Sequence, residues 1–167
     1  LAAWKIRIVG PHETHLGGGG ENFLRAMQAL GQRSGARVEW PGQIFDPEKL
    51  AEEYRNSLVF AYPSVAKTGE AFGVAPLEAM AYGCAPFLSN LACFRDFIVD
   101  GVTGFVFDQR ATVPEKKLGT RLADLLGLGP EQIMRIGAQG RAKVAKFDVA
   151  TAAQRSLAEF ARPLPNP

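Results

Sequence analysis

The chain has 167 residues, of which 47% are hydrophobic and 22% are charged, and its formal net charge is +2. This composition is typical of a globular domain with enough apolar residues to build a core. A charge so close to neutral argues against nucleic-acid binding and against strong attraction to a membrane surface. No apolar run approaches the roughly 18 residues of a membrane span, and the first residues do not resemble a signal peptide.

The two cysteines, Cys84 and Cys93, provide neither a disulfide framework nor a metal-binding spacing. We expect each to act as a small buried hydrophobic residue in a reducing compartment. The predicted location is therefore the cytoplasm, with peripheral association of the intact protein with the inner membrane as the alternative.

The first predicted strand covers residues 6–9 and is followed directly by Gly10. The loop up to Gly20 contains four successive glycines, which would let the backbone approach a phosphate closely. The loop has neither the dinucleotide-binding fingerprint nor the lysine of a P-loop. A phosphate-binding loop and a flexible surface loop therefore both remain open. His12 and His15 have no further metal ligands nearby in the sequence, and we expect both to be solvated.

Residues 21–30 have the amphipathic pattern of a helix, and residues 37–40 form the next predicted strand. Gly42, Gln43 and Ile44 make a turn directly after this strand. The turn either contributes to a ligand site or only leads the chain into the following helix, and the residues alone do not decide between these interpretations.

Asp46 followed by Pro47 is typical of a helix start, because aspartate is a good N-cap and proline suits the first helical position. The apolar face of this helix would carry Leu50, Ala51 and Tyr54. A strand, a helix and another strand in succession predict a parallel α/β arrangement with right-handed crossovers.

The stretch from residue 62 to residue 83 contains most of the residues that could take part in binding or catalysis. It follows a continuous apolar run at residues 58–62, the pattern of a strand covered on both faces. A helix is predicted for residues 74–82, and Gly83 is suited to its end. Its N-terminal amides would form an anion site beyond the end of the strand.

Two glutamates bracket the start of this helix. Glu78 lies in its first turns, whereas Glu70 precedes it in the loop, so the two are not stacked on one helical face. They can therefore address different parts of one elongated ligand, where a carboxylate would accept hydrogen bonds from hydroxyls. Either glutamate alone could be only a dipole partner on a solvated surface. Their combination with the strand and the glycine favours a binding site.

The rest of the chain predicts one more helix after the strand at 85–88, then a last strand and three helices. Ser89 and Asn90 are expected to cap a short helix that runs through Ile98, and Asp148 to cap the final helix. The remaining predicted ranges are a strand at 104–107, helices at 115–126, 130–146 and 149–161, and an extended tail at 162–167.

The segment from Glu70 to Glu78 resembles the E-x7-E signature of retaining glycosyltransferases with two Rossmann-like domains, the GT-B fold. The resemblance is to the glycosyltransferase group 1, or family 4, type. Further segments at residues 38–42, 62–64, 78–84 and 100–105 resemble motifs of that family and occur in its order. Together they cover roughly residues 4–160.

This resemblance implies a Rossmann-like, three-layer α/β/α sandwich with a parallel sheet, which would be the C-terminal, donor-nucleotide-binding half of a GT-B enzyme. We expect residues 1–147 to form this domain, 148–161 to be its C-terminal helix and 162–167 to be a tail. In the family this domain normally opens with a further strand and helix, whose arginine and lysine neutralise the donor diphosphate. The sequence begins after them, and Lys67 is expected to face solvent.

The resemblance also implies transfer of a hexose from a nucleotide diphosphate sugar to a glycan, lipid or small molecule, with retention at the anomeric carbon. Glu70 would be the catalytic residue, placed at the donor sugar's hydroxyls near the reacting carbon, and Glu78 would hold the ribose. The predicted donor-binding residues are Gly10, Gly42, Gln43, Ile44, Ser64, Phe72, Gly73, Val74 and Glu78. No metal and no cofactor are expected.

Two other functions remain open: a non-catalytic module that binds a nucleotide or sugar, and a sugar-nucleotide epimerase on the same fold. We expect the acceptor to bind an N-terminal domain that this sequence lacks. The isolated chain should then bind donor weakly, fail to turn over, and self-associate through its truncated edge. The sequence does not determine the base, the sugar or the acceptor.

Overall fold

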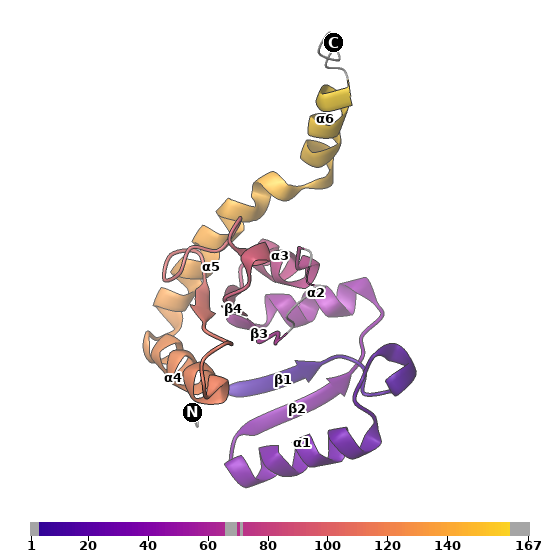
Figure 1. Cartoon of the computed structure of the whole chain (residues 1–167), viewed down its shortest axis with the longest axis vertical. Helices are drawn as coiled ribbons and strands as arrows, with labels where there is room; N and C mark the ends of the chain where they lie inside the picture. The colour runs from indigo at the N-terminus through magenta and orange to yellow at the C-terminus, as the bar shows by residue number, and fades with distance from the viewer. Residues whose placement is uncertain (1–3, 66–69, 71, 161–167) are drawn as a thin grey trace. The chain divides into compact units, whose positions relative to one another are not determined.

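The computed structural model describes residues 4–65, 70 and 72–160, and all structural statements concern these residues. The chain divides into two compact units, Leu1–Glu52 and Glu53–Pro167, called here the first and the second unit. Five strands pair in parallel throughout the described residues (Figure 1). The predicted number and direction of strands are confirmed, although the strands form two hydrogen-bonded sheets instead of one. A single domain over residues 1–147 stays a prediction.

The first unit combines two strands with one long helix. Strands β1 (Lys5–Val9) and β2 (Arg37–Gly42) form a parallel pair. Helix α1 (Glu21–Ser34) connects them and runs alongside the sheet (Figure 1). It continues beyond the predicted end at Leu30 and stops where Gly35 takes a left-handed conformation, with φ of 68°.

The glycine-rich loop between β1 and α1 folds back on itself around the short 3-10 helix η1 (Thr14–Leu16). The amide of Gly20 donates to the carbonyl of His12 at 2.6 Å. The ring of His12 is 2.9 Å from a carboxylate oxygen of Glu21. The prediction of solvated histidines is therefore confirmed for His15, which is exposed, and wrong for His12, which has a carboxylate partner.

Helix α2 (Pro47–Arg55) begins in the first unit and ends in the second. The carboxylate of Asp46 accepts two amides of the first turn, at 2.9 and 3.3 Å, so the predicted N-cap is confirmed. On the predicted core face, Ala51 and Tyr54 are buried and Leu50 is half-buried.

The second unit is built around three parallel strands in the order β3 (Val59–Tyr62), β4 (Ala85–Ser89) and β5 (Phe105–Phe107). Every residue of the central strand β4 is buried, as expected for a parallel strand covered on both faces. Helix α3 (Val74–Ala81) makes the connection from β3 to β4.

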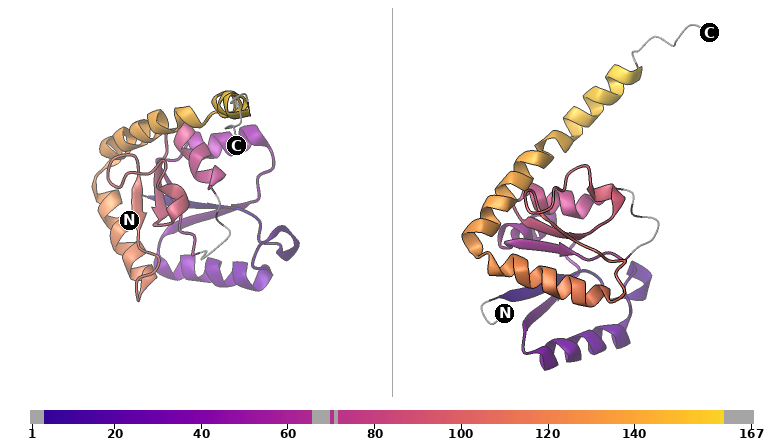
Figure 2. Two further views of the ribbon diagram at one scale, coloured as in Figure 1. Left: turned by 45° about the horizontal axis from the view of Figure 1, so that its top comes forward. Right: turned by 60° about the vertical axis from the view of Figure 1, so that its left-hand side comes forward.

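The predicted C-terminal helices are present (Figure 2). They are α4 (Pro114–Gly127), α5 (Pro130–Val144), which continues into the 3-10 helix η3 (Ala145–Phe147), and α6 (Val149–Phe160). The carboxylate of Asp148 accepts the amide of Thr151 at 2.9 Å, which confirms Asp148 as the cap of α6. The predicted tail lies outside the described residues.

Large aromatic residues form much of the core of the second unit. Phe87 is fully buried and stacks on Phe107, with ring centroids 5.5 Å apart. Both cysteines are free; Cys84 is buried as predicted and Cys93 is half-buried. Other fully buried side chains are Met80, Leu88, Phe94, Phe97, Leu125 and Ile133.

Helix α3 has Tyr82 as its C-cap, and Gly83, predicted to follow the end of the helix, has a φ of 89°. The amide of Gly83 donates to Met80 and the amide of Cys84 donates to Ala79, the paired hydrogen bonds of a Schellman motif. Helix α5 packs directly on this turn, because a Cβ atom at Gly137 would overlap the carbonyl oxygen of Gly83.

The short helix expected for residues 89–98 is wrong. Only the 3-10 turn η2 (Ala92–Phe94) forms there. The hydroxyl of Ser89 is buried and donates to the carbonyl of Ser64 at 2.6 Å, so it does not cap a helix. The amide of Asn90 donates to a carbonyl at the end of β5, which keeps the chain extended at the position where a helix would begin.

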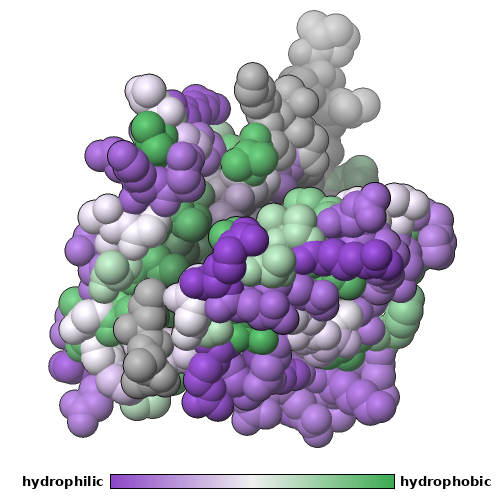
Figure 3. All heavy atoms as spheres, turned by 90° about the horizontal axis from the view of Figure 1, so that it is seen from below, coloured by the Kyte–Doolittle hydropathy of each residue, from purple (hydrophilic) through white to green (hydrophobic). Residues whose placement is uncertain are grey.

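Hydrophobic side chains are exposed on β1, where Ile6 and Ile8 are 46% and 43% accessible. On the face in Figure 3, hydrophobic residues form several groups between hydrophilic ones. Exposed apolar side chains are compatible with self-association, which stays a prediction. Within the described part of the chain, no helix combines the length and apolarity that crossing a membrane requires.

Candidate functional site

The N-terminus of α3 is the centre of the candidate site. Its N-cap is Gly73, which has a φ of 78° and supplies no side-chain cap. A Cβ atom at Gly73 would also lie 2.5 Å from the ring of Phe94. Glycine is required here both by the backbone conformation and by the close ring. The first amides of the helix and its dipole favour an anion at this end.

The residues on either side of Gly73 differ in their environment. Phe72 is 39% exposed, and its ring makes edge contacts with Phe97 and Phe147 at centroid distances of 6.2 and 5.9 Å. Val74 is 63% exposed. Phe72 thus packs the loop against the core, whereas Val74, at the start of the helix, is accessible to solvent.

Glu70 is half-buried and lies within reach of two hydroxyl donors. The hydroxyl of Tyr62 is 3.3 and 3.5 Å from its two carboxylate oxygens, and that of Ser64 is 3.4 Å from one of them. Burial and the adjacent Glu70 carboxylate raise the pKa of Tyr62. The phenol therefore stays protonated at neutral pH and can donate a hydrogen bond.

Glu78 is exposed on the first turns of α3, and the hydroxyl of Tyr54 lies 3.4 Å from its Oε2 atom. The ring of Tyr54 is buried against Tyr82, with centroids 5.6 Å apart and planes 16° apart. Burial, and after it the charge and hydrogen bond of Glu78, raise the pKa of Tyr54 to about 12. A neutral donor therefore faces Glu78 throughout the physiological pH range.

The predicted residues of the first unit lie at the ends of its two strands. The amide of Gly10 donates to the carbonyl of Gly42 at 3.0 Å, and both residues have positive φ angles. Gln43 is exposed and Ile44 is half-buried. The structure thus brings Gly10 and Gly42 together in the first unit, and Ser64 and Glu70 together in the second.

The described residues contain no group of three His, Cys, Asp or Glu side chains that could hold a metal ion. Lys67 lies outside the described residues. The expected absence of a metal and of a cofactor stays a prediction.

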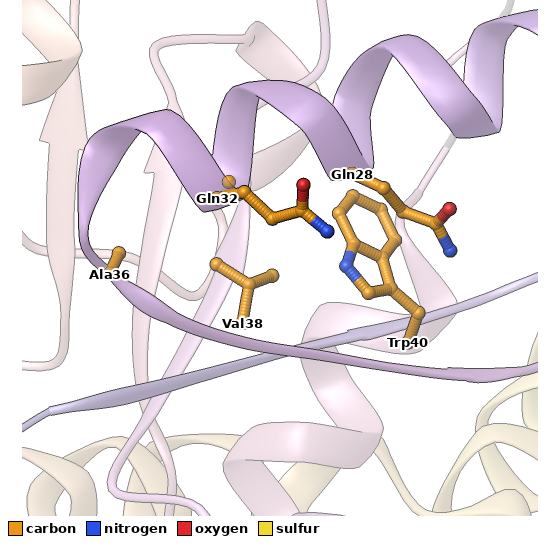
Figure 4. A pocket seen from close by; sticks show the side chains of 6 residues that line it. Gln28, Gln32, Ala36, Val38 and Trp40 are labelled. Atoms are coloured by element: carbon orange, nitrogen blue, oxygen red, sulfur yellow. The ribbon is translucent and has the colours of Figure 1, made fainter.

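Two surface cavities lie apart from these residues. One, of about 330 Å³, lies between α1 and β2, where the ring of Trp40 faces Gln28 and Gln32 (Figure 4). The other, of about 260 Å³, is lined by α3, α5 and η3 and includes Leu77 and Phe147. No predicted site residue lines either cavity.

The sequence did not reveal the phenol donors of the two glutamates. Tyr54 is predicted only as a core residue of its helix, and Tyr62 only as the end of a strand. Their contacts with carboxylates depend on chain segments that come together only in the folded unit. A tyrosine with a buried ring beside a polar site is the one available signal, because its hydroxyl needs a partner.

Parallel strands connected by helices place the chain in the class of Rossmann-like α/β folds, and solved structures show which fold of this class it matches. The fold matches sucrose-phosphate synthase from Thermosynechococcus elongatus, with 26% identity, a TM-score of 0.73 and coverage of 93% of this chain and 38% of that chain. It also matches Anabaena HepE in complex with UDP and glucose, with 20% identity, a TM-score of 0.70 and coverage of 94% and 40%. The chain is a Rossmann-like half of a GT-B fold, as predicted.

The family model described as "Glycosyl transferases group 1" matches residues 2–142, so the chain belongs to this family. Phosphatidyl-myo-inositol mannosyltransferase of Mycolicibacterium smegmatis is 32% identical over 135 residues, which are 80% of this chain and 32% of that protein. The enzyme of the same name from Mycobacterium tuberculosis is 31% identical over 137 residues, covering 79% and 35%. The chain spans about a third of the length of these relatives.

Proposed function

We propose that the chain is the donor-binding half of a retaining glycosyltransferase that transfers a hexose from a nucleotide diphosphate sugar. The observation that carries this proposal is the pair Glu70 and Glu78 around the start of α3, each with a hydroxyl donor. Membership of the group 1 family and the UDP complex of a protein with the same fold support it.

In the proposed complex, the helix N-terminus binds the diphosphate of the donor. Amides at Phe72, Gly73 and Val74 would face the phosphate oxygens, where negative charge increases as the glycosidic bond breaks. The left-handed Gly73 lets the backbone approach a ligand without a side chain in between. These groups would therefore stabilise the nucleotide as a leaving group.

The two glutamates have different proposed roles. Glu78, which is exposed on the helix, would accept hydrogen bonds from the ribose hydroxyls. Glu70, half-buried and with both oxygens near Tyr62, would hold hydroxyls of the donor sugar near its anomeric carbon. In the first unit, the backbone of the turn at Gly42, Gln43 and Ile44 would hold the base, with Gly10 beside it.

The acceptor and the complete reaction belong to the whole protein. We propose that the acceptor is a glycan, a lipid or a small molecule and that it binds outside this chain. The relatives named as phosphatidyl-myo-inositol mannosyltransferases make a lipid one of these three. A cytoplasmic location, with peripheral association of the intact protein with the inner membrane as the alternative, is part of the same proposal.

A thermal-shift titration of the chain with UDP, GDP and ADP tests donor binding. Bound ligand raises the melting temperature in proportion to the logarithm of its concentration over the dissociation constant, so millimolar nucleotide detects weak sites. We expect one of the three to raise the melting temperature and Glu78→Ala to reduce that shift.

Glu131→Ala is the matched control, because Glu131 is an exposed glutamate in the first turn of α5. It should leave the shift unchanged. A shift that survives Glu78→Ala, or no shift with any nucleotide, would contradict the proposed site. Sugar transfer by the isolated chain would contradict the proposal that the acceptor binds elsewhere.

A further inference from the structure

Each of the two glutamates faces a tyrosine whose position is fixed by other aromatic rings. Tyr54, at the end of α2, faces Glu78, and Tyr62, at the end of β3, faces Glu70. Both tyrosines lie in the second unit, on segments that precede α3 in the chain (Figure 1). The sequence analysis assigned neither tyrosine to the site.

The ring of Tyr54 is held on several sides. Tyr82 stacks on it, and the edge of Phe60 contacts it at a centroid distance of 5.8 Å. The guanidinium of Arg55 lies 5.4 Å from the Tyr82 ring, which extends the stack. The backbone carbonyl of Tyr54 accepts the thiol of the buried Cys84 at 3.2 Å. A ring fixed in this way presents its hydroxyl in one direction.

The ring of Tyr62 belongs to the same aromatic series. Phe60 lies two residues earlier on β3 and stacks on Tyr62, with centroids 6.2 Å apart and planes 12° apart. The edge of the fully buried Phe94 contacts the other end of the series at 6.2 Å. One continuous run of rings therefore connects the phenol facing Glu78 with the phenol facing Glu70.

The hydrogen bonds leave each carboxylate able to accept from a ligand. Tyr54 contacts only one oxygen of Glu78 among the described residues, so the other oxygen is available to a ribose hydroxyl. Tyr62 lies near both oxygens of Glu70, and Ser64 lies near one of them. A carboxylate that is oriented before the ligand arrives loses less side-chain freedom on binding.

We propose that Tyr54 and Tyr62 are positioning residues, with Tyr54 orienting Glu78 toward the ribose and Tyr62 orienting Glu70 toward the donor sugar. This inference rests on the proposed function. It adds to that function the reason why the two glutamates are oriented: each carboxylate faces the hydroxyl of one tyrosine, and both tyrosines belong to the same series of packed aromatic rings. Each phenol is expected to act on a different part of the donor.

Calorimetry with matched ligands tests Tyr54. The ligands are the nucleoside diphosphate that stabilises the chain, among UDP, GDP and ADP, and its 2′,3′-dideoxy counterpart. Tyr54→Phe keeps the ring and removes the hydroxyl. We expect it to weaken binding of the ribonucleotide about five- to tenfold, in the range of one ordinary net hydrogen bond, and to leave the affinity for the dideoxy compound within about twofold.

Tyr82→Phe is the matched control, because it removes a hydroxyl from the same ring stack without removing the Tyr54 donor. It should leave both dissociation constants unchanged. In the double variant Tyr54→Phe with Glu78→Ala, the tyrosine change should add nothing to the glutamate change. Equal weakening of both ligands by Tyr54→Phe would indicate only a structural role and overturn the inference.

The role of Tyr62 is tested by comparing the affinity of the chain for a nucleotide sugar with its affinity for the same nucleoside diphosphate without the sugar. The probes are the same nucleoside diphosphate and its glucose and mannose derivatives. We expect Tyr62→Phe to remove most of the gain of the preferred nucleotide sugar over the bare diphosphate, while the affinity for the diphosphate stays within about twofold. Loss of affinity for both, or no loss for the sugar, would overturn the role of Tyr62.

The outcomes separate this inference from the proposed function. If wild-type chain binds no nucleotide, both are wrong. If wild-type chain binds and loses affinity with Glu78→Ala but not with Tyr54→Phe, the proposed function stands and the positioning role is wrong. Melting temperatures of the Phe variants without ligand show whether each variant is folded before its affinity is interpreted.

Discussion

The two units of the chain differ in how they hold their site residues. In the first unit, every side chain of β1 is exposed, and Ala51 is the one described residue that is buried. In the second unit, every residue of β4 is buried, and the core is rich in aromatic rings. The predicted site groups of the first unit are therefore backbone groups at the turns that contain Gly10 and Gly42. Those of the second unit are carboxylates whose orientation depends on packed side chains.

This difference matters for the precision of each part of the site. The turn at Gly42 depends on backbone conformation and on one amide bond from Gly10. The orientation of Glu78 depends on Tyr54, and hence on the stack of rings around it. Substitutions in the core of the second unit should therefore affect both stability and ligand binding, whereas those on the surface of the first unit should affect neither strongly.

The largest contrast is expected from truncating one phenylalanine in each unit. Phe87→Ala in the second unit removes a fully buried ring and should lower the free energy of unfolding by about 3–5 kcal/mol. Phe23→Ala in the first unit removes a ring that is 56% exposed and should cost less than about 1 kcal/mol. Urea denaturation of both variants measures the difference. Equal losses would refute the contrast in packing.

The second contrast uses the same substitution in two helices. Gly137→Ala in α5 places a methyl group against the backbone carbonyl of Gly83 and should destabilise the chain by about 2–3 kcal/mol. Gly31→Ala in α1 places a methyl group against the side chain of Val38, 3.4 Å from its nearest atom, and should be neutral or stabilising by up to about 1 kcal/mol. Thermal unfolding compares them directly. A loss of similar size at Gly31 would mean that the first unit is as tightly packed as the second.

The smallest effects are expected at the two aspartate caps. Asp46→Ala at the start of α2 should cost about 1 kcal/mol in a global unfolding experiment. Asp148→Ala should act locally on α6 and increase amide exchange there. The hydrogen bond from the Thr151 side chain and the Thr151 amide lower the pKa of Asp148.

The sign of the pH dependence at Asp148 follows from this shift. A lowered pKa means that the ionised form stabilises the folded state, so its contribution is complete above the ordinary aspartate pKa and is lost as pH falls through the folded-state pKa. The protection factors of the α6 amides, which are exchange rates corrected for the intrinsic pH dependence of exchange, should therefore fall on acidification in the wild type, and less so in Asp148→Ala. Protection factors in α6 with the same acid dependence in both would contradict the cap.

Much of the fold could be predicted because the informative patterns are local. Apolar runs marked the strands, Asp46 and Asp148 marked two helix starts, and Gly83 marked a helix end. The helix expected at residues 89–98 was wrong because Ser89 and Asn90 have the residue types of helix caps, although the buried Ser89 and the paired Asn90 form other hydrogen bonds in the structure. A local sequence pattern does not reveal these hydrogen-bond partners, because they lie far away in the chain.

The site shows the same division between local and long-range information. Glu70, Gly73 and Glu78 could be selected from the sequence because they follow one another within one short segment. Tyr54 could not, because its contact with Glu78 spans 24 residues and depends on how α2 packs beside α3. The separation of the strands into two sheets was also not predicted, because strand patterns do not specify which edges pair.

The most direct test of the account is an amide chemical-shift titration of the chain with the nucleoside diphosphate that stabilises it. The account predicts that the largest shifts occur at Phe72, Gly73, Val74 and Glu78, and that Glu78→Ala reduces them. Shifts centred instead on the cavity at Trp40, or spread without a centre, would contradict a donor site at the start of α3.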